Sequence, residues 1–172
     1  SLLSGPIDRA GMLVPQLEKN RTFNYSDASE GMAQILWGLF KKLVIADNCS
    51  FVTKTIFENY DQYSSSTLLL SSFFYIIQVY ADFSGYSDMA IGFARLIGFR
   101  ITQNFNYPFF AQNIAEHWQR WHISLTSWMT EYVYTPLNFK FRSLRNKGII
   151  ISIIINFVLV GLWHGANWTF VV

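Results

Sequence analysis

The stretch NIAEHWQRWHISLTSWMTEYVYTP, residues Asn113 to Pro136, decides how the rest of the chain is interpreted. Its pattern predicts one helix, capped by Asn113 with Glu116 in the position of a capping box and ended by Pro136. At roughly 100° per residue one narrow side is aromatic and the opposite side is polar. His122 lies at the edge of the aromatic side and is expected to face the buried part of the fold. The aromatic side consists of Trp118, Trp121, Leu125, Trp128 and Tyr132.

A second histidine lies in GLWHGANWTF, Gly161 to Phe170, which the pattern predicts to be an apolar helix. A polar side chain in such a helix is costly, which favours a functional role for His164. A lone buried histidine also occurs as a structural residue, so spacing alone leaves both interpretations open. A neutral imidazole can take a proton from a hydroxyl group. We predict that His122 and His164 meet in a membrane-embedded reaction site.

The composition indicates an all-α, multi-pass integral membrane protein. Of the 172 residues, 51% are hydrophobic and 14% are charged, whereas about 25% are charged in soluble domains. The net charge of +2, with no broad basic face, argues against binding to nucleic acid. The single cysteine, Cys49, excludes an internal disulfide and is expected in the core.

The segment Gly31–Ala46 has a helical period, and Ser26 or Asp27 is expected to cap it. Its lysines, Lys41 and Lys42, are costly in hydrocarbon. We prefer an interfacial helix, or one leaning on other helices, with snorkelling lysines over a functional lysine pair. We expect residues 11–30 to form a loop with short helical pieces and residues 47–65 a polar connection. The apolar side of the helix comprises Ile35, Leu36, Leu39, Phe40, Leu43 and Val44.

Two stretches are apolar enough to cross a bilayer, Thr67–Phe99 and Gly148–Trp163. The first is longer than a ~30 Å hydrocarbon core requires. It is therefore expected to form either two helices or one long tilted helix broken at Gly85. Asp82 and Asp88 interrupt it, and two roles stay open for them: bonding to neighbouring backbone or hydroxyl groups, or lining a polar channel.

The connections between these segments also carry signals. Pro108 predicts an irregular, re-entrant or surface loop over Arg100–Gln112. Residues 139–147 hold four basic side chains and are expected on the cytoplasmic side. His117 and His122 are five residues apart and would diverge by about 140° on a helix, so no metal site is predicted. Because Ser1 is not methionine and Val172 ends an apolar run, we expect a piece of a longer protein.

Six motifs together resemble those of the membrane-bound O-acyltransferase (MBOAT) family, in particular its bacterial alginate O-acetylation branch. They keep their order and run over nearly the whole chain. The resemblance implies a single, incomplete MBOAT transmembrane domain over residues 1–172. The motifs are SGPIDR (4–9), GLFKKLVIADN (38–48), YADFSGYSDMAIGFARLIGF (80–99), NFNYPF (104–109), EHWQRWHISLTSWMTEYVYTPL (116–137) and GLWHGANWTF (161–170).

The resemblance also implies an activity, the transfer of acetyl groups from a cytoplasmic donor towards hydroxyls of an exported polysaccharide. It assigns catalytic roles to His164 and His122. Substrate-binding roles are expected for Trp118, Trp121, Trp163 and Asn167, although the tryptophan stripe is also typical of core or interface packing.

The remaining expectations follow from the same branch. No cofactor is expected to stay bound, and acetyl-CoA or another acyl thioester would be the donor substrate. Expected partners are the lipid bilayer of the bacterial inner membrane, periplasmic acetyl-transfer or polysaccharide-export proteins, and the polysaccharide acceptor. Three alternatives remain: a D-alanyl transfer protein for teichoic acids, a non-enzymatic transporter or export subunit, and a purely structural membrane partner of a synthase.

Overall fold

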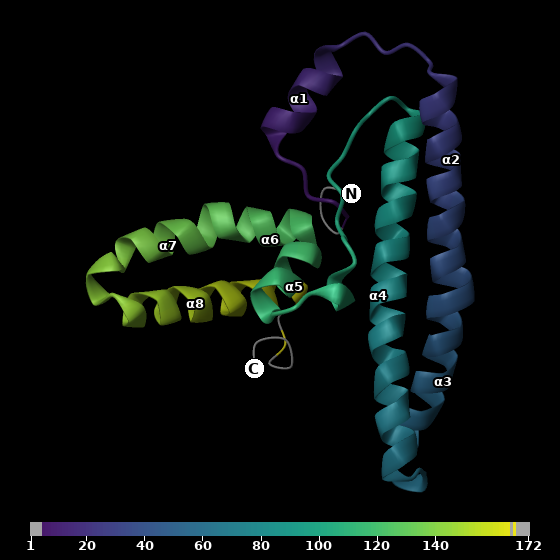
Figure 1. Ribbon diagram of the computed structural model, residues 1–172, viewed down its shortest axis with the longest axis vertical. Helices are drawn as coiled ribbons and strands as arrows, with labels where there is room; N and C mark the ends of the chain where they lie inside the picture. Colours follow the sequence, from purple (N-terminus) through teal and green to yellow (C-terminus); the bar gives the residue numbers. More distant parts are fainter. Residues whose placement is uncertain (1–4, 166, 168–172) are drawn as a thin grey trace. The chain divides into compact units, whose positions relative to one another are not determined.

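The computed structural model describes residues 5–165 and 167, and these residues form helices and loops without a strand (Figure 1). The chain divides into two compact units, an N-terminal unit, Ser1–Asn106, and a C-terminal unit, Tyr107–Val172. The prediction of an all-helical fold is thus confirmed for the part of the chain that the structure describes.

In the N-terminal unit a long helical rod lies against helix α4, Ser65–Leu96 (Figure 1). The rod consists of α2, Tyr25–Phe40, the π-helical segment η1, Lys41–Ala46, and α3, Asp47–Glu58. The expected polar connection over residues 47–65 is therefore wrong, because most of that segment continues the rod. The short 3-10 turn η2, Tyr60–Gln62, leads into α4.

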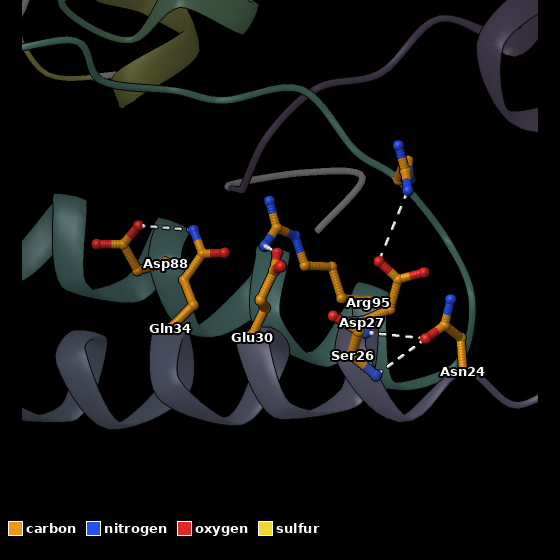
Figure 2. A network of polar contacts seen from close by, with 8 residues as sticks. Asn24, Ser26, Asp27, Glu30, Gln34, Asp88 and Arg95 are labelled. Carbon is orange, nitrogen blue, oxygen red and sulfur yellow. Dashed lines mark hydrogen bonds and ion pairs between the residues drawn. The ribbon is translucent and has the colours of Figure 1, made fainter.

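The rod begins earlier than the sequence predicts. Asn24, rather than Ser26 or Asp27, caps α2 (Figure 2), since its side-chain oxygen accepts hydrogen bonds from the amides of Ser26 at 2.9 Å and Asp27 at 3.4 Å. The preceding loop contains one further helix, α1, Ala10–Glu18. Gln16 of α1 bonds both main-chain groups of Arg100, which ties α1 to the segment after α4.

The rod contacts α4 through small and polar residues rather than through its apolar side. Gly31, Ile35, Gly38 and Lys41 are buried. Of the apolar side that the pattern defines, all residues except Ile35 are exposed. Helices that associate in lipid show this inverted arrangement, because lipid tails are as apolar as leucine and the interface favours small side chains. Cys49 is buried, as predicted.

Two pairs of glycines let the backbones of α2 and α4 touch. A Cβ atom at Gly38 would lie 2.6 Å from the carbonyl oxygen of Gly85, and one at Gly92 would lie 2.5 Å from that of Gly31. Because any larger side chain would force the helices apart, these positions fix the interhelical distance. Gly85 therefore allows the rod to pack closely on α4. It does not break the helix as expected, since α4 is continuous.

Pairs of polar side chains also bridge the interface between the rod and α4 along its length, and we call this set of pairs the polar ladder. Glu30 pairs with Arg95 at 3.0 Å, and the amide of Gln34 donates to Asp88 at 3.0 Å (Figure 2). Further along, the hydroxyl of Thr53 donates to Gln78 at 2.6 Å. Such bonds satisfy polar groups that would otherwise be costly in an apolar surrounding.

The two lysines lie at the centre of this ladder. Lys41 is 8% exposed, forms an ion pair with Asp88 and donates to the hydroxyl of Ser84 at 3.1 Å. Lys42 lies between Asp82 at 2.8 Å and Asp47 at 2.7 Å. The snorkelling expected for Lys41 is therefore wrong. Both acids of α4 hold the helices together, with lysines as partners in place of the expected backbone or hydroxyl groups.

An irregular strap, residues 97–106, follows α4 and confirms the irregular loop expected there. The buried Asn104 donates to the hydroxyl of Ser87 at 3.2 Å. The ring of Phe105 packs edge-on against Tyr80 and Phe83, with centroids at 5.6 and 5.2 Å. The NFNYPF motif thus anchors the strap on α4.

The C-terminal unit begins with a 3-10 turn, η3, Pro108–Phe110, and runs through α5, Ile114–Arg120, and α6, Ile123–Met129. It continues through the π-helical segment η4, Thr130–Tyr134, and α7, Thr135–Lys140. After the 3-10 turn η5, Arg142–Leu144, helix α8, Asn146–His164, returns alongside this run (Figure 1).

The single helix predicted over residues 113–136 is wrong in two respects. It breaks at Trp121 and His122, and Pro136 lies in the first turn of α7 instead of ending the helix. Asn113 does cap α5, because its side chain accepts from the amide of Glu116 at 2.8 Å. Glu116 accepts in turn from the amide of Gln112, one residue before the position that a capping box predicts.

Among the described residues, α4 and α8 are the helices long and apolar enough to cross a membrane. Their most apolar windows are only 22% and 17% buried, respectively. Both helices thus satisfy the length and hydropathy that a membrane span requires, and the described residues leave most of their apolar surface uncovered.

Candidate active site

The break between α5 and α6 places His122. Its backbone is left-handed, with φ 45° and ψ 52°, which is uncommon for a residue other than glycine. Thr126 closes the break, since its amide donates to the carbonyl of His122 at 2.9 Å and its hydroxyl to the carbonyl of Trp121 at 3.2 Å. The imidazole is consequently turned into the unit, and His122 is only 4% exposed.

Trp163 of α8 lies beside both histidines. Its ring centroid is 6.1 Å from that of His122 and 4.9 Å from that of His164. Residues some forty positions apart in the chain therefore share one indole neighbour. This grouping, one buried imidazole and one exposed imidazole with a tryptophan beside both, is the candidate site.

The two imidazoles differ in their surroundings. His122 lies outside the two candidate membrane spans, and burial, followed by the nearby charge of His164, lowers its pKa to about 4. His122 is thus neutral near pH 7, with one ring nitrogen able to donate a hydrogen bond and the other able to accept one.

His164 is the last residue of α8 and is exposed. The amide of Gly165 donates to the carbonyl of Gly161 at 3.2 Å and closes the helix end. Asn167 is exposed, and its amide donates to the carbonyl of Gly165 at 2.9 Å. The helix predicted over Gly161–Phe170 thus ends at His164, while residues 166 and 168–170 lie outside the described part of the chain. An exposed imidazole at a helix end is accessible to a substrate.

The other two predicted substrate-binding tryptophans make different contacts. Trp121 stacks on His117, with centroids 5.8 Å apart and planes inclined by 18°. Trp118 packs edge-on against Phe157 of α8 at 5.7 Å. His117 is itself held, with its Nδ1 atom 3.1 Å from the carbonyl oxygen of Pro108. The contacts of Trp118 and His117 join α5 to α8 and η3, and the Trp121 stack packs on α5 itself, whereas Trp163 lies beside His122 and His164.

Sequence reasoning missed the left-handed backbone that presents His122. No glycine or proline marks the break, and the aromatic stripe continues across it. It also missed the lysine–aspartate pairs, for which a signal existed, because opposite charges at membrane depth are expected to pair. Across residues 5–165 and 167, no three His, Cys, Asp or Glu side chains gather in a way that would hold a metal ion.

Comparison with known proteins places this site in context. The sequence model of MBOAT, the membrane-bound O-acyltransferase family, matches residues 2–172. The chain is 41% identical to the probable alginate O-acetylase AlgI of Azotobacter vinelandii over 99% of its length, and 38% identical to the peptidoglycan O-acetyltransferase of Helicobacter pylori, also over 99%. It is 32% identical to the teichoic acid D-alanyltransferase of Bacillus subtilis over 96%. The chain covers 34%, 32% and 44% of these proteins, so it spans about a third of the length of the first two.

Proposed function

Because this chain belongs to the membrane-bound O-acyltransferase family, we propose that it forms part of an enzyme that moves acetyl groups from a cytoplasmic donor towards hydroxyls of an exported polysaccharide such as alginate. The O-acetylases among its relatives, at 38% and 41% identity, support this activity. Both units belong to one incomplete MBOAT domain of a multi-pass protein in the bacterial inner membrane. The exposed apolar surfaces of α4 and α8 support the membrane location.

The observation that carries the proposal is the position of Trp163 beside His122 and His164. His164, exposed at the end of α8, acts as the base. It takes the proton of the accepting hydroxyl while the hydroxyl oxygen attacks the carbonyl carbon of the acyl thioester. The carbon–sulfur bond then breaks, and the thiolate that leaves receives the proton.

His122 serves the same step as a neutral imidazole. Burial keeps it uncharged near pH 7, so that it orients the thioester or donates a hydrogen bond to the carbonyl oxygen as negative charge develops there. Trp163, Trp121, Trp118 and Asn167 line the path of the substrates. The donor is acetyl-CoA or another acyl thioester, and a periplasmic acetyl-transfer or export protein delivers the group to the polysaccharide.

Peptidoglycan is the second candidate acceptor, because a peptidoglycan O-acetyltransferase aligns over the same 99% of the chain as the alginate O-acetylase. D-alanyl transfer to teichoic acid has weaker support, at 32% identity. A transporter is disfavoured, since Asp82 and Asp88 are engaged in ion pairs with Lys42 and Lys41.

The test is acetyl transfer by the purified full-length protein in lipid nanodiscs. Release of free thiol from acetyl-CoA is measured with alginate oligosaccharides, with peptidoglycan fragments and without acceptor, each in the presence of the periplasmic acetyl-transfer protein. His164→Ala is expected to abolish release while the protein remains folded in the membrane, and His122→Ala to reduce it by about 10²-fold or more, the scale of one lost oxyanion donor.

The comparison variant is His117→Ala, which removes a histidine of the same unit that contacts Pro108, Trp118 and Trp121 and does not lie beside Trp163. Because both reacting imidazoles remain, this variant should lose much less acetyl transfer than either His164→Ala or His122→Ala. Transfer by His164→Ala at the wild-type rate would refute the assignment, and absence of thiol release with either acceptor would argue against the donor or acceptors named here.

A further inference from the structure

The C-terminal end of α4 carries a cavity that the acyl-transfer site does not use. Its volume is about 530 Å³, within the range of small-molecule sites. It lies within the N-terminal unit, between the last turns of α4 and the start of the strap. Its lining is almost entirely apolar and includes Tyr86, Met89, Phe93, Ile97, Phe99 and Ile101.

A second, smaller cavity of about 220 Å³ lies beside the first, since Ile97 lines both and Arg21 of the second packs on Phe99 of the first. Its character is polar, since Arg21, Asn24, Asp27 and Arg95 contribute to its wall. An apolar chamber and a polar chamber therefore lie next to each other at the same end of one helix. A ligand that fits both chambers has an apolar chain and a polar head.

The charged residues that line the polar chamber are Arg21, Arg95 and Asp27. Arg95 pairs with Glu30 at 3.0 Å (Figure 2), and Arg100 lies 3.6 Å from Asp27. Arg21 forms no ion pair in the described part of the chain. With the partners Glu30 and Arg100, which lie outside the lining of the chamber, three arginines accompany two carboxylates, and the unpaired positive charge is that of Arg21.

The side chain of Arg21 is held in place by neighbouring residues. Its guanidinium carbon lies 4.3 Å from the ring centroid of Phe99, which also lines the apolar chamber. Gly98 has a left-handed φ of 77°, and a Cβ atom there would lie 3.3 Å from Cγ and Cδ of Arg21. Glycine at this position therefore lets the arginine lie flat against the strap, with its charge at the junction of the two chambers.

The position of the two chambers along α4 indicates the class of ligand. At ~1.5 Å per residue, the 32 residues of α4 extend about 48 Å, beyond a ~30 Å hydrocarbon core. At least one end of α4 thus lies outside that core, and the ion pairs of Arg95 with Glu30 and of Arg100 with Asp27 at its C-terminal end favour the headgroup layer, where lipid phosphates lie, as the surrounding of that end. We propose that these adjoining chambers bind one phospholipid with an anionic headgroup, its acyl chain against Phe93 and Ile97 and its headgroup at Arg21.

The test uses the full-length protein in nanodiscs that contain phosphatidylglycerol with a photoactivatable group on its acyl chain. After irradiation, mass spectrometry of the digested protein is expected to find cross-links within residues 86–101. Unlabelled phosphatidylglycerol should compete at least fivefold better than phosphatidylcholine, because one basic side chain near an anionic surface is worth about that factor.

Arg21→Gln should lower cross-linking about fivefold, and Ala94→Trp, which fills the apolar chamber, should lower it for every lipid. The control is Lys54→Gln. It removes the same charge from α3, which accompanies α4 near its opposite end, and the side chain of Lys54 is 73% exposed. The proposal is overturned if residues 86–101 are not labelled, as they would not be where another protein segment fills the chambers. Equal competition by the two lipids, or equal effects of Arg21→Gln and Lys54→Gln, would also overturn it.

Discussion

Replacing Lys41 by methionine tests whether the polar ladder holds the N-terminal unit together. The side chains of Lys41 and Asp88 are 11% and 21% exposed, and they form an ion pair across the interface between the rod and α4. Methionine has a similar length and removes only the charge and its hydrogen bonds. The carboxylate of Asp88 would keep the amide of Gln34, at 3.0 Å, but would lose its cation.

The expected cost follows from this geometry. Removing one partner of a buried ion pair typically costs ~3–5 kcal/mol, since the other charge stays buried without compensation. Because Gln34 still donates to Asp88 and a fifth of that side chain is exposed, we expect the lower end, ~3 kcal/mol. This value corresponds to a change of roughly a hundredfold in the unfolding equilibrium.

The assay is reversible unfolding of the full-length protein in mixed detergent micelles. The control Lys54→Met breaks an exposed pair with Glu58 at 3.8 Å and should cost at most ~0.5 kcal/mol. The double variant Lys41→Met with Asp88→Leu removes both charges and should recover most of the loss. The reasoning is refuted if Lys41→Met costs no more than Lys54→Met, or if the double variant is no more stable than the single one.

Three further predictions concern helix contact, the break and pH. Gly38→Ala places a Cβ atom 2.6 Å from a backbone oxygen of α4 and should cost ~1–3 kcal/mol of unfolding free energy, whereas Gly11→Ala, with nothing within 4 Å, should cost nothing. Thr126→Val removes the hydroxyl bond to the carbonyl of Trp121 and should cost ~1 kcal/mol, which Thr126→Ser restores; equal losses would contradict the role of that bond. The folded-state pKa of His122 near 4 lies below the ~6.5 of an unfolded chain, so its contribution to stability is full above pH ~6.5 and declines as the pH falls towards 4. His122→Gln should flatten this part of a melting-temperature profile, and an unchanged profile would contradict the burial of a neutral imidazole.

The sequence predicted those features of the fold that depend on local composition. The apolar run Gly148–Trp163 forms a helix, Asn113 caps α5, and Pro108 lies in an irregular segment. Each of these depends on a residue's own backbone preference or on the hydrophobicity of its immediate neighbours. Such signals need no knowledge of tertiary partners.

Features that depend on tertiary partners were missed. The polar interruption around Gly85 was expected to break the helix, but Gly38 and Lys41 on the rod accommodate it and the helix continues. Hydrophobic periodicity also predicted the wrong buried side for the rod. In an apolar surrounding, the side with small and polar residues is the one that packs against the neighbouring helix. The charged residues of each ion pair are visible in the sequence. Which of them pair depends on the antiparallel register of the rod and α4, and that register cannot be read from local patterns.

The candidate site was predictable as residue types but not as geometry. His122 and His164 stand out as rare polar residues within apolar motifs. The left-handed backbone at His122, which interrupts the predicted helix and turns the imidazole towards Trp163, has no local signal. It depends on how α5 and α6 pack on α8, and thus on contacts between residues far apart in the chain.

The most direct test of the account is a structure of the full-length protein with a non-hydrolysable acetyl thioester bound. We expect the thioester carbonyl to lie beside Trp163, within about 2.6–3.2 Å of a ring nitrogen of His122 or His164, with the acceptor path open to His164. A thioester bound away from these residues, or imidazoles of His122 and His164 that line separate cavities, would contradict the central claim that the two histidines serve one acyl-transfer site.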